Sequence, residues 1–211
     1  MNEIIVFGAG GRAGRAVLDE ARRRGHGVTA VVRDPARHPD LPGRVAAADV
    51  TDADAVARLA AGHDAAVCAA ADLTADPAVF FPAAARALVA GLTRSGVRRL
   101  VHVGLAPVLP TPHGPLLMDT PGYPQEYRAF YLGHAAGADV LAAADPAPDW
   151  LVLSPSGDFD HGGARTGRYA TAAADAAARV SYPDFAIAVL DEIERPRHHR
   201  THVGIATGPE A

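Results

Sequence analysis

The glycine-rich stretch GAGGRAGRAV at residues 8–17 is the first segment whose residue types suggest a chemistry, and it follows the apolar run IIVF. A helix that begins there would present unpaired N–H groups and a partial positive charge, and glycine would let a phosphate approach them closely. The spacing fits two dinucleotide-binding patterns, G-x-G-x-x-G/A and G-x-x-G-x-x-G, and does not distinguish between them. The alternative to both is a tight turn that needs glycine only for steric reasons. The patterns use Gly8, Gly10 and Ala13, or Gly8, Gly11 and Gly14.

The next apolar run ends in VVRDPAR, at the position where dinucleotide-binding folds hold the adenosine ribose. NAD sites usually place Asp or Glu there, whereas arginine suits a 2′-phosphate through charge-assisted hydrogen bonds. Arg33 therefore predicts NADP(H) as the cofactor, with Arg37 and Arg12 as helpers. A solvated Arg33, or Asp34 as an acid on the ribose, is the alternative.

Two later strand ends could complete a dinucleotide site. Asp49 and Val50 end the third predicted strand, where Asp49 either accepts from an adenine amino group or forms a turn. Cys68, the only cysteine, is interpreted as a buried small hydrophobic residue because no basic partner is evident. The fourth predicted strand ends in small residues that would let a nicotinamide ribose approach, and these are Ala69, Ala70 and Ala71.

Four side chains are candidate proton donors: Tyr127, Tyr131 and His134 on a predicted helix, and His113 on the loop before it. Histidine alone among them has an unperturbed pKa near neutrality, about 6.5 against about 10 for tyrosine. The spacing of the three helical residues places them on one face, toward either a cofactor or the core. A core or surface role is the alternative for each.

All 20 residues counted as Lys+Arg are arginine, so the chain contains no lysine. This composition excludes a Schiff base and lysine-assisted acid–base chemistry. Hydride transfer to a simple ketone forms an alkoxide that needs an acid, whereas a flavin or quinone gives a delocalised anion that solvent can protonate. The sequence therefore favours flavin-like or quinone-like acceptors.

Histidines near the C-terminus resemble a metal cluster at first sight. The apparent cluster consists of His198, His199 and His202. His198 and His199 would point to opposite faces of a strand, and no acidic or cysteine ligand lies beside the three histidines in the sequence. We therefore expect no metal site. Residues 158–161 follow the sixth predicted strand, where open α/β sheets bind ligands, and a plain surface loop explains them equally well.

The segments that would position these residues alternate between strands and helices. Strands are predicted at residues 3–7, 26–32, 65–70, 98–103, 149–154 and 201–206, and a further strand, the third in chain order, is predicted to end at residue 50. Helices are predicted at residues 12–24, 77–95, 125–144 and 184–194. One more helix is predicted to begin at a capping box formed by Thr51 and Asp54. Apolar strands of this kind indicate a parallel sheet covered on both faces. We predict a Rossmann-like, doubly wound, mainly parallel α/β fold in a single domain over residues 1–211, with substrate loops near 104–124 and 154–168.

The composition limits the class of protein. The chain is 49% hydrophobic and 21% charged, which is ordinary for a folded protein. Its apolar runs fall short of the roughly 18 residues that span a bilayer, and a net charge of −4 without a basic cluster argues against nucleic acid. No secretion signal is visible and one cysteine cannot form an internal disulfide, so a cytoplasmic location is expected. The expected partner is a small-molecule substrate.

Six segments spread over nearly the whole chain carry a resemblance, namely GAGGRAGRAV, VTAVVRDPAR, ADVTDADAV, SGVRRLVHVG, DTPGYPQEY and VSYPDFAIAVLDEIERP. They resemble the NAD(P)H-binding atypical short-chain reductases, the NmrA-like group that includes proposed NADH-flavin reductases and biliverdin-IXβ reductase. The resemblance implies a Rossmann-like fold, NADP(H), and reduction of flavins, quinones or related acceptors. By position, the resemblance implies that the pyrophosphate is bound by Gly8, Gly11, Arg12 and Gly14. It likewise implies that Arg33 and Arg37 bind the 2′-phosphate, and that Asp49 and Val50 bind the adenine.

The departures from this group fall on the catalytic side. Typical short-chain dehydrogenases use Ser with Tyr-x-x-x-Lys, but the corresponding strand end reads GLAP at residues 104–107 and lysine is absent. Flavin-reducing relatives carry a histidine where this chain has Gly157. We predict an NADPH-dependent reductase of a small conjugated acceptor. The alternatives are a non-redox NADP(H)-binding sensor, or a lyase, isomerase or cyclase acting on a biosynthetic intermediate.

Overall fold

The apolar runs predicted as strands lie side by side in one sheet in the computed structural model, which describes residues 1–209. The strands of this sheet are β1 (Glu3–Phe7), β2 (Gly27–Val32), β3 (Arg44–Ala47), β4 (Ala65–Cys68), β5 (Arg99–Val103), β6 (Asp149–Pro155), β8 (Tyr169–Thr171) and β10 (Thr201–Thr207). Their order is β3-β2-β1-β4-β5-β6-β10-β8, and every adjacent pair is parallel except β10 with β8. The order from β3 to β6 is that of dinucleotide-binding folds, which confirms the predicted fold class.

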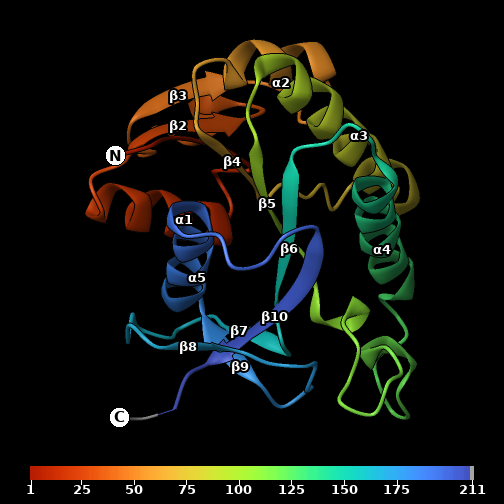
Figure 1. The fold of residues 1–211 in the computed structure, drawn as a ribbon. Coiled ribbons are helices and arrows are strands. Elements are labelled where there is room, and N and C mark those ends of the chain that lie inside the picture. The colour runs from red at the N-terminus through yellow and green to blue at the C-terminus, as the bar shows by residue number, and fades with distance from the viewer. Residues whose placement is uncertain (210–211) are drawn as a thin grey trace.

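Helices cover both faces of this sheet, as a parallel sheet requires. The α-helices within residues 1–209 are α1 (Arg12–Arg23), α2 (Ala53–Ala60), α3 (Pro77–Ser95), α4 (Arg128–Ala143) and α5 (Tyr182–Glu194). Figure 1 shows α1 and α5 on one face, and α2, α3 and α4 on the other. No helix in this part of the chain is long and apolar enough to cross a bilayer.

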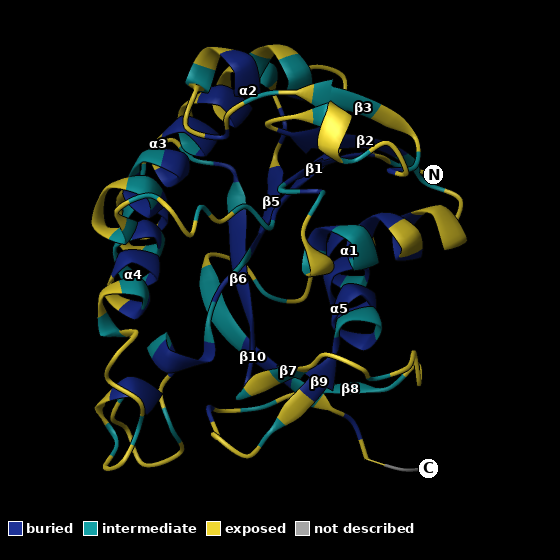
Figure 2. Cartoon of the chain, turned by 180° about the vertical axis from the view of Figure 1, so that it is seen from behind, coloured by how far each residue is buried: buried dark blue, intermediate teal, exposed yellow. Residues whose placement is uncertain are grey.

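Side chains alternate along β1 between two buried clusters. Ile4 and Val6 belong to the cluster on the α1 and α5 face, and Ile5 and Phe7 belong to the cluster on the opposite face. All four are fully buried, and Figure 2 shows β5 and β6 at the centre of the molecule largely in the dark blue of buried residues. The strand ends are thereby held in place by apolar packing on both sides.

Local signals set the helix boundaries in two cases. Pro77 begins α3 and Gly96 ends it with a φ of +78°, which agrees with the predicted bounds of 77–95. The Asp76 carboxylate caps this helix, which the sequence analysis did not predict. The predicted capping box at the start of α2 is wrong. The cap is Asp52, whose carboxylate accepts from the N–H groups of residues 54 and 55, while the Thr51 hydroxyl donates to Asp49 instead.

Irregular segments surround the carboxyl end of the sheet. The loop over residues 104–124 contains two 3₁₀ turns, η2 (Ala106–Val108) and η3 (Leu117–Asp119). The predicted helix start at Gln125 is three residues too early, because the side-chain amide of Gln125 donates to the carbonyls of Met118 and Tyr123 in the preceding loop. The short strands β7 (Asp158–Asp160) and β9 (Arg179–Ser181) form a separate parallel pair that the sequence did not predict.

Candidate active site

A cavity of about 600 Å³ lies where β1, β2 and β4 end, and we call it the glycine-turn cavity. This is the point where the strand order reverses, which is the ligand-binding position of open α/β sheets. All the predicted dinucleotide-binding residues except Gly14 line it, namely Gly8, Gly10, Gly11, Arg12, Ala13, Arg33, Arg37, Asp49, Val50, Ala69, Ala70 and Ala71. The strands therefore bring together residues that are up to 63 positions apart in the sequence.

Backbone contacts explain two of the glycines. Gly8 has a φ of +76°, and a Cβ there would lie 2.4 Å from the backbone nitrogen of Ala70. A Cβ on Gly14 would lie 2.4 Å from the carbonyl oxygen of Gly8, so the helix can approach the strand this closely only with glycine. Because Gly14 rather than Ala13 makes this approach, the geometry matches the G-x-x-G-x-x-G pattern.

The first turn of α1 is left free for an anion. Gly11 is its N-cap, no side chain accepts a hydrogen bond from this turn, and the turn contains no acidic residue. In contrast, side chains cap three other helices, α2, α3 and α5, and these are Asp52, Asp76 and Ser181. The unpaired N–H groups of α1 and the space above the glycines fit a pyrophosphate in charge and in size.

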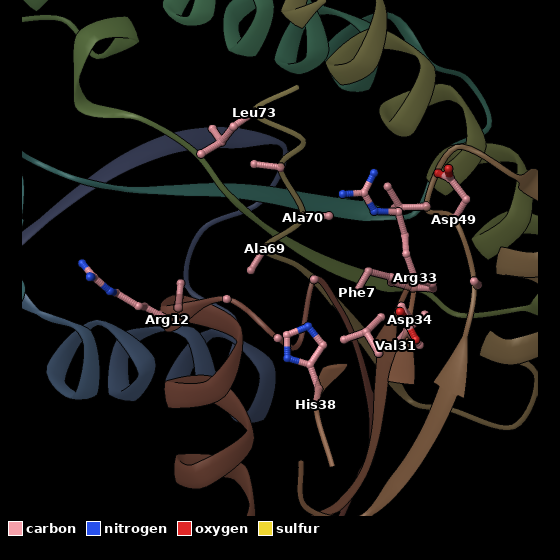
Figure 3. A pocket seen from close by; sticks show the side chains of 18 of the residues that line it. Phe7, Arg12, Val31, Arg33, Asp34, His38, Asp49, Ala69, Ala70 and Leu73 are labelled. Carbon is pink, nitrogen blue, oxygen red and sulfur yellow. The ribbon is translucent and has the colours of Figure 1, made fainter. Parts of the chain in front are cut away.

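Arg33 lines the glycine-turn cavity and also forms an ion pair with Asp72. Hydrogen bonds from Thr74, together with the Arg33 guanidinium, lower the pKa of Asp72 to about 2, so this carboxylate is ionised at neutral pH. Figure 3 shows Arg33 and Arg12 at opposite ends of the cavity. Asp72 thus holds the Arg33 guanidinium at the cavity and competes with any phosphate for it.

The two aspartates near Arg33 have local partners. Asp49 lines the cavity, and its Oδ1 accepts hydrogen bonds from the N–H and the hydroxyl of Thr51 at 2.9 and 2.8 Å. Asp34 also lines the cavity and accepts from the N–H of Ala36 at 3.0 Å. Both carboxylates therefore form turns, and a role of Asp49 toward adenine stays a prediction.

Several lining residues were not predicted from the sequence. His38 follows Arg37 in the same turn, and its ring lies so close to Gly10 that a Cβ there would be 2.5 Å from Nε2. Proximity to Arg37 could have indicated it. Tyr182 begins α5, and its ring stacks on Phe159 with centroids 4.1 Å apart and an interplanar angle of 13°. Only the fold brings this pair to a cavity formed mainly by the first 80 residues.

Arg12 is held by a residue from the far half of the chain. Its guanidinium contacts Nδ1 of His161, and the hydroxyl of Tyr182 lies 3.3 Å from the same nitrogen. Arg165 and buried Glu20 of α1 form two hydrogen bonds of 2.9 and 3.0 Å, which fix the loop that carries His161. The loop over residues 158–168 is therefore held against α1, and its Phe159 lines the glycine-turn cavity.

A second cavity of about 450 Å³ adjoins the first, and we call it the tyrosine cavity. Its walls come from both predicted substrate loops and from α4, and its main side chains are Tyr123, Tyr131, Pro124, Asp158, Phe159 and Arg179. Phe159 lines both cavities. Burial raises the pKa of Tyr123 and of Tyr131, so both phenols stay protonated at neutral pH.

The four predicted proton donors are not brought together. Tyr131 lines the tyrosine cavity, whereas Tyr127 precedes the first residue of α4 and is 60% exposed. His134 is buried, and its ring lies 3.8 Å from that of Phe81, measured between centroids. His113 is exposed on the loop and lines neither cavity. Of the four, Tyr131 alone lines a described cavity.

His134 of α4 is one of three histidines with a lowered pKa, of which His102 and His134 are buried and His202 is partly buried. His102 of β5 and His202 of β10 both pair in register with Val152 of β6, so they lie on either side of it. His202 is hydrogen-bonded to Ser154 at 2.6 Å, and Nδ1 of His102 has no partner among the described residues. Burial lowers the pKa of the three imidazoles to about 4 for His102, 3 for His134 and 4 for His202.

The remaining sequence candidates have separate structural partners. His198 is bonded to Glu192 at 2.7 Å and His199 to Asp149 at 2.8 Å, so these histidines and His202 do not converge. Cys68 is fully buried, and burial raises the pKa of its thiol to about 12. The thiol is therefore neutral at physiological pH, as a small hydrophobic residue would be.

Comparison with known proteins shows the family to which this chain belongs. Residues 8–196 match the NAD(P)H-binding family, a span that begins at the first glycine of the turn and ends after α5. The chain belongs to the NAD(P)H-binding family. This membership confirms the resemblance drawn from the sequence and supports a nicotinamide dinucleotide as the cofactor.

Relatives of this family are similar over the whole chain. Bacillus subtilis YwnB is 33% identical over 216 residues, which cover 99% of this chain and 100% of YwnB. A solved structure of a proposed exported protein from Burkholderia pseudomallei is 36% identical, with a TM-score of 0.84 and coverage of 98% and 100% of the two chains. A proposed NADH-flavin reductase from Streptococcus pneumoniae is 27% identical, with a TM-score of 0.85 and the same coverage.

Membership of this family and the similarity to the proposed NADH-flavin reductase support oxidoreductase chemistry in general. The match to the family includes the glycine turn, Arg33 and Phe159. The glycine-turn cavity is therefore the candidate dinucleotide site, and the tyrosine cavity is the candidate substrate site.

Proposed function

We propose that this NAD(P)H-binding protein uses NADPH to reduce a small conjugated acceptor such as a quinone or a flavin. The observation that carries the proposal is the position of Phe159, which lines the candidate dinucleotide site and the candidate substrate site at once. The two cavities adjoin there, so donor and acceptor can occupy neighbouring positions. Proximity of this kind is the main contribution a protein makes to hydride transfer.

The side chains around the glycine turn fit the dinucleotide. The unpaired N–H groups at the start of α1 and the Arg12 guanidinium would bind the pyrophosphate, and Arg33 with Arg37 would bind the 2′-phosphate. The small residues at 69–71 leave room for the nicotinamide ribose. When bound, NADPH supplies a hydride, and the acceptor takes one proton from water to give its reduced form and NADP⁺.

The missing proton donor favours a conjugated acceptor. The chain contains no lysine, and Gly104 stands where a catalytic serine would be expected. The pKa of Tyr131 is raised by burial, which makes its phenol a weaker acid. A quinone or flavin does not need an acid in the site, since the negative charge spreads over the ring and water protonates it. The tyrosines then serve as flat walls for the acceptor ring.

Arg33→Asp should weaken NADPH binding about 10- to 100-fold and change NADH binding little, because a charge-assisted phosphate contact contributes about 1.5–3 kcal/mol. Fluorescence titration of both nucleotides measures the two dissociation constants. Asp72→Asn is the matched control, since it releases Arg33 from its ion pair and should tighten NADPH binding. Equal losses for both nucleotides in Arg33→Asp would contradict a 2′-phosphate site.

The proposed activity is tested by following nicotinamide absorbance while NADPH is mixed with the protein and a quinone or a flavin. Oxidation of NADPH that depends on both the protein and the acceptor is the expected result. Binding of NADPH without oxidation by any acceptor would overturn the reductase proposal and favour a dinucleotide-sensing protein. Absence of binding would remove the dinucleotide site itself.

A further inference from the structure

Arg179 is the only positively charged side chain among the described residues that line the tyrosine cavity. It lies on β9, directly beside Asp158 of β7, and in Figure 1 this strand pair is at the lower end of β10. The other lining residues are mainly aromatic, proline or small. The cavity thus holds one guanidinium and one carboxylate among mainly uncharged walls, and their hydrogen bonds decide which of the two is available to a ligand.

The Arg179 guanidinium is fixed in place by the backbone. Its Nη1 donates to the carbonyl oxygens of Ala176 and Ala178, both at 2.8 Å. These bonds use both hydrogens of Nη1, and an arginine carries five N–H donors. The N–H of Nε and the two of Nη2 therefore remain, and they form the edge that binds a carboxylate or phosphate through two parallel hydrogen bonds.

No acidic side chain among residues 1–209 forms an ion pair with Arg179. Its cross-strand neighbour Asp158 instead accepts the N–H of Phe159 at 2.7 Å. The contrast with Arg33, which Asp72 neutralises, is informative because both arginines line a cavity. Arg179 keeps its charge available, and holding it in place costs a ligand little side-chain entropy.

The flat walls define the rest of the ligand. The rings of Tyr123 and Tyr131 lie 5.9 Å apart between centroids at an interplanar angle of 63°, and Phe159 borders the same cavity. Aromatic faces and edges of this kind bind a planar ring. The cavity therefore combines surfaces for a flat ring with one fixed cation.

We propose that Arg179 forms an anion subsite, so that the acceptor is a planar ring bearing a carboxylate or phosphate group. This inference rests on the proposed function, because it takes the tyrosine cavity as the acceptor site. Arg179 acts here as a specificity-determining residue that binds the acidic substituent. The Asp158 carboxylate opposes it across the strand pair and limits the affinity for an anion.

Binding without turnover gives the first test. Riboflavin and FMN share one ring system and differ by a phosphate, and quenching of their fluorescence measures binding to the protein saturated with NADP⁺. We expect FMN to bind about tenfold more tightly than riboflavin, as one charge-assisted contact allows. Arg179→Gln should abolish this preference, and Asp158→Asn should increase it.

Turnover gives the second test, with 1,4-naphthoquinone and its 2-sulfonate as a neutral and an anionic acceptor. Arg179→Gln should raise KM for the sulfonate about tenfold and leave KM for the neutral quinone unchanged. Arg58→Gln is the matched control, since Arg58 is exposed on α2 and lines neither cavity. It changes the net charge equally and should leave both values unchanged. Thermal unfolding midpoints of all variants exclude misfolding.

The outcomes separate the two proposals. Loss of the anion preference in Arg179→Gln alone supports the subsite. An unchanged preference in that variant, or no preference in the original protein, overturns it. Failure of NADPH oxidation with both quinones and with both flavins overturns the proposed function, while the flavin titrations still decide whether Arg179 binds an anion.

Discussion

Replacing Gly8 with alanine should lower the affinity for NADPH about 100-fold or more and destabilise the fold. The added Cβ would lie 2.4 Å from the backbone nitrogen of Ala70, so either β1 or the end of β4 must move. A displacement of about 1 Å in a binding turn is enough for a loss of this size. Alanine at a φ of +76° adds about 1–2 kcal/mol of backbone strain.

Gly62→Ala is the matched control for this prediction. Gly62 has a φ of +82°, but a Cβ there would meet no atom within 4 Å. The substitution should therefore cost only the backbone strain and leave NADPH affinity unchanged. Urea unfolding and nucleotide titration of both variants separate strain from overlap. Similar affinities in Gly8→Ala and Gly62→Ala would mean that the glycine turn does not hold the dinucleotide.

The protein should lose most of its stability between about pH 6.5 and pH 4, because two buried histidines and one partly buried histidine must stay neutral in the folded state. Unfolded histidines take up a proton near pH 6.5, whereas burial keeps the pKa of His102, His134 and His202 at about 4, 3 and 4. Between these values the unfolded state binds more protons. The free energy of unfolding then falls with decreasing pH by about 1.4 kcal/mol per pH unit for each histidine.

The combined slope is large on the scale of protein stability. Three histidines give at most about 4 kcal/mol per pH unit, against a total of about 5–15 kcal/mol for an ordinary domain. Urea unfolding at several pH values, followed by the fluorescence of Trp150, measures the slope. We expect the midpoint to drop steeply below pH 6.

His134→Phe should make this slope shallower by about 1.4 kcal/mol per pH unit, since phenylalanine does not titrate and suits a position beside Phe81 and Phe130. His113→Gln removes an exposed imidazole and should leave the slope unchanged. A slope in His134→Phe equal to that of the original protein would show that the buried histidines do not govern acid unfolding.

The sequence predicts which residues the glycine-turn cavity brings together, for a physical reason. Gly8, Arg33, Asp49 and Ala69 each follow an apolar strand, and parallel strands bring their carboxyl ends to one edge. Regular alternation is enough to place them. The G-x-x-G-x-x-G pattern could be separated from its alternative only when Gly14 was seen against the Gly8 carbonyl.

The substrate half was largely beyond prediction, because short irregular segments build it. β7 and β9 have three residues each, too few to show a periodicity, and they bring Phe159 and Arg179 to one cavity. Helical spacing placed Tyr127 with Tyr131 and His134, but Tyr127 precedes the helix and faces solvent. Spacing describes a helix face only where the helix has already begun.

One aromatic ring, that of Phe159, borders both the glycine-turn cavity and the tyrosine cavity, the proposed sites of the two ligands. The face of Phe159 rests on Tyr182, and the ring forms part of both cavity walls. A ligand that shifts this ring on one side changes the shape offered on the other, so the two binding equilibria are linked. Thermodynamic reciprocity then requires each ligand to alter the affinity for its neighbour by the same factor. Oxidised and reduced dinucleotide can thus differ in how strongly they retain the second molecule, which would set the order in which products leave.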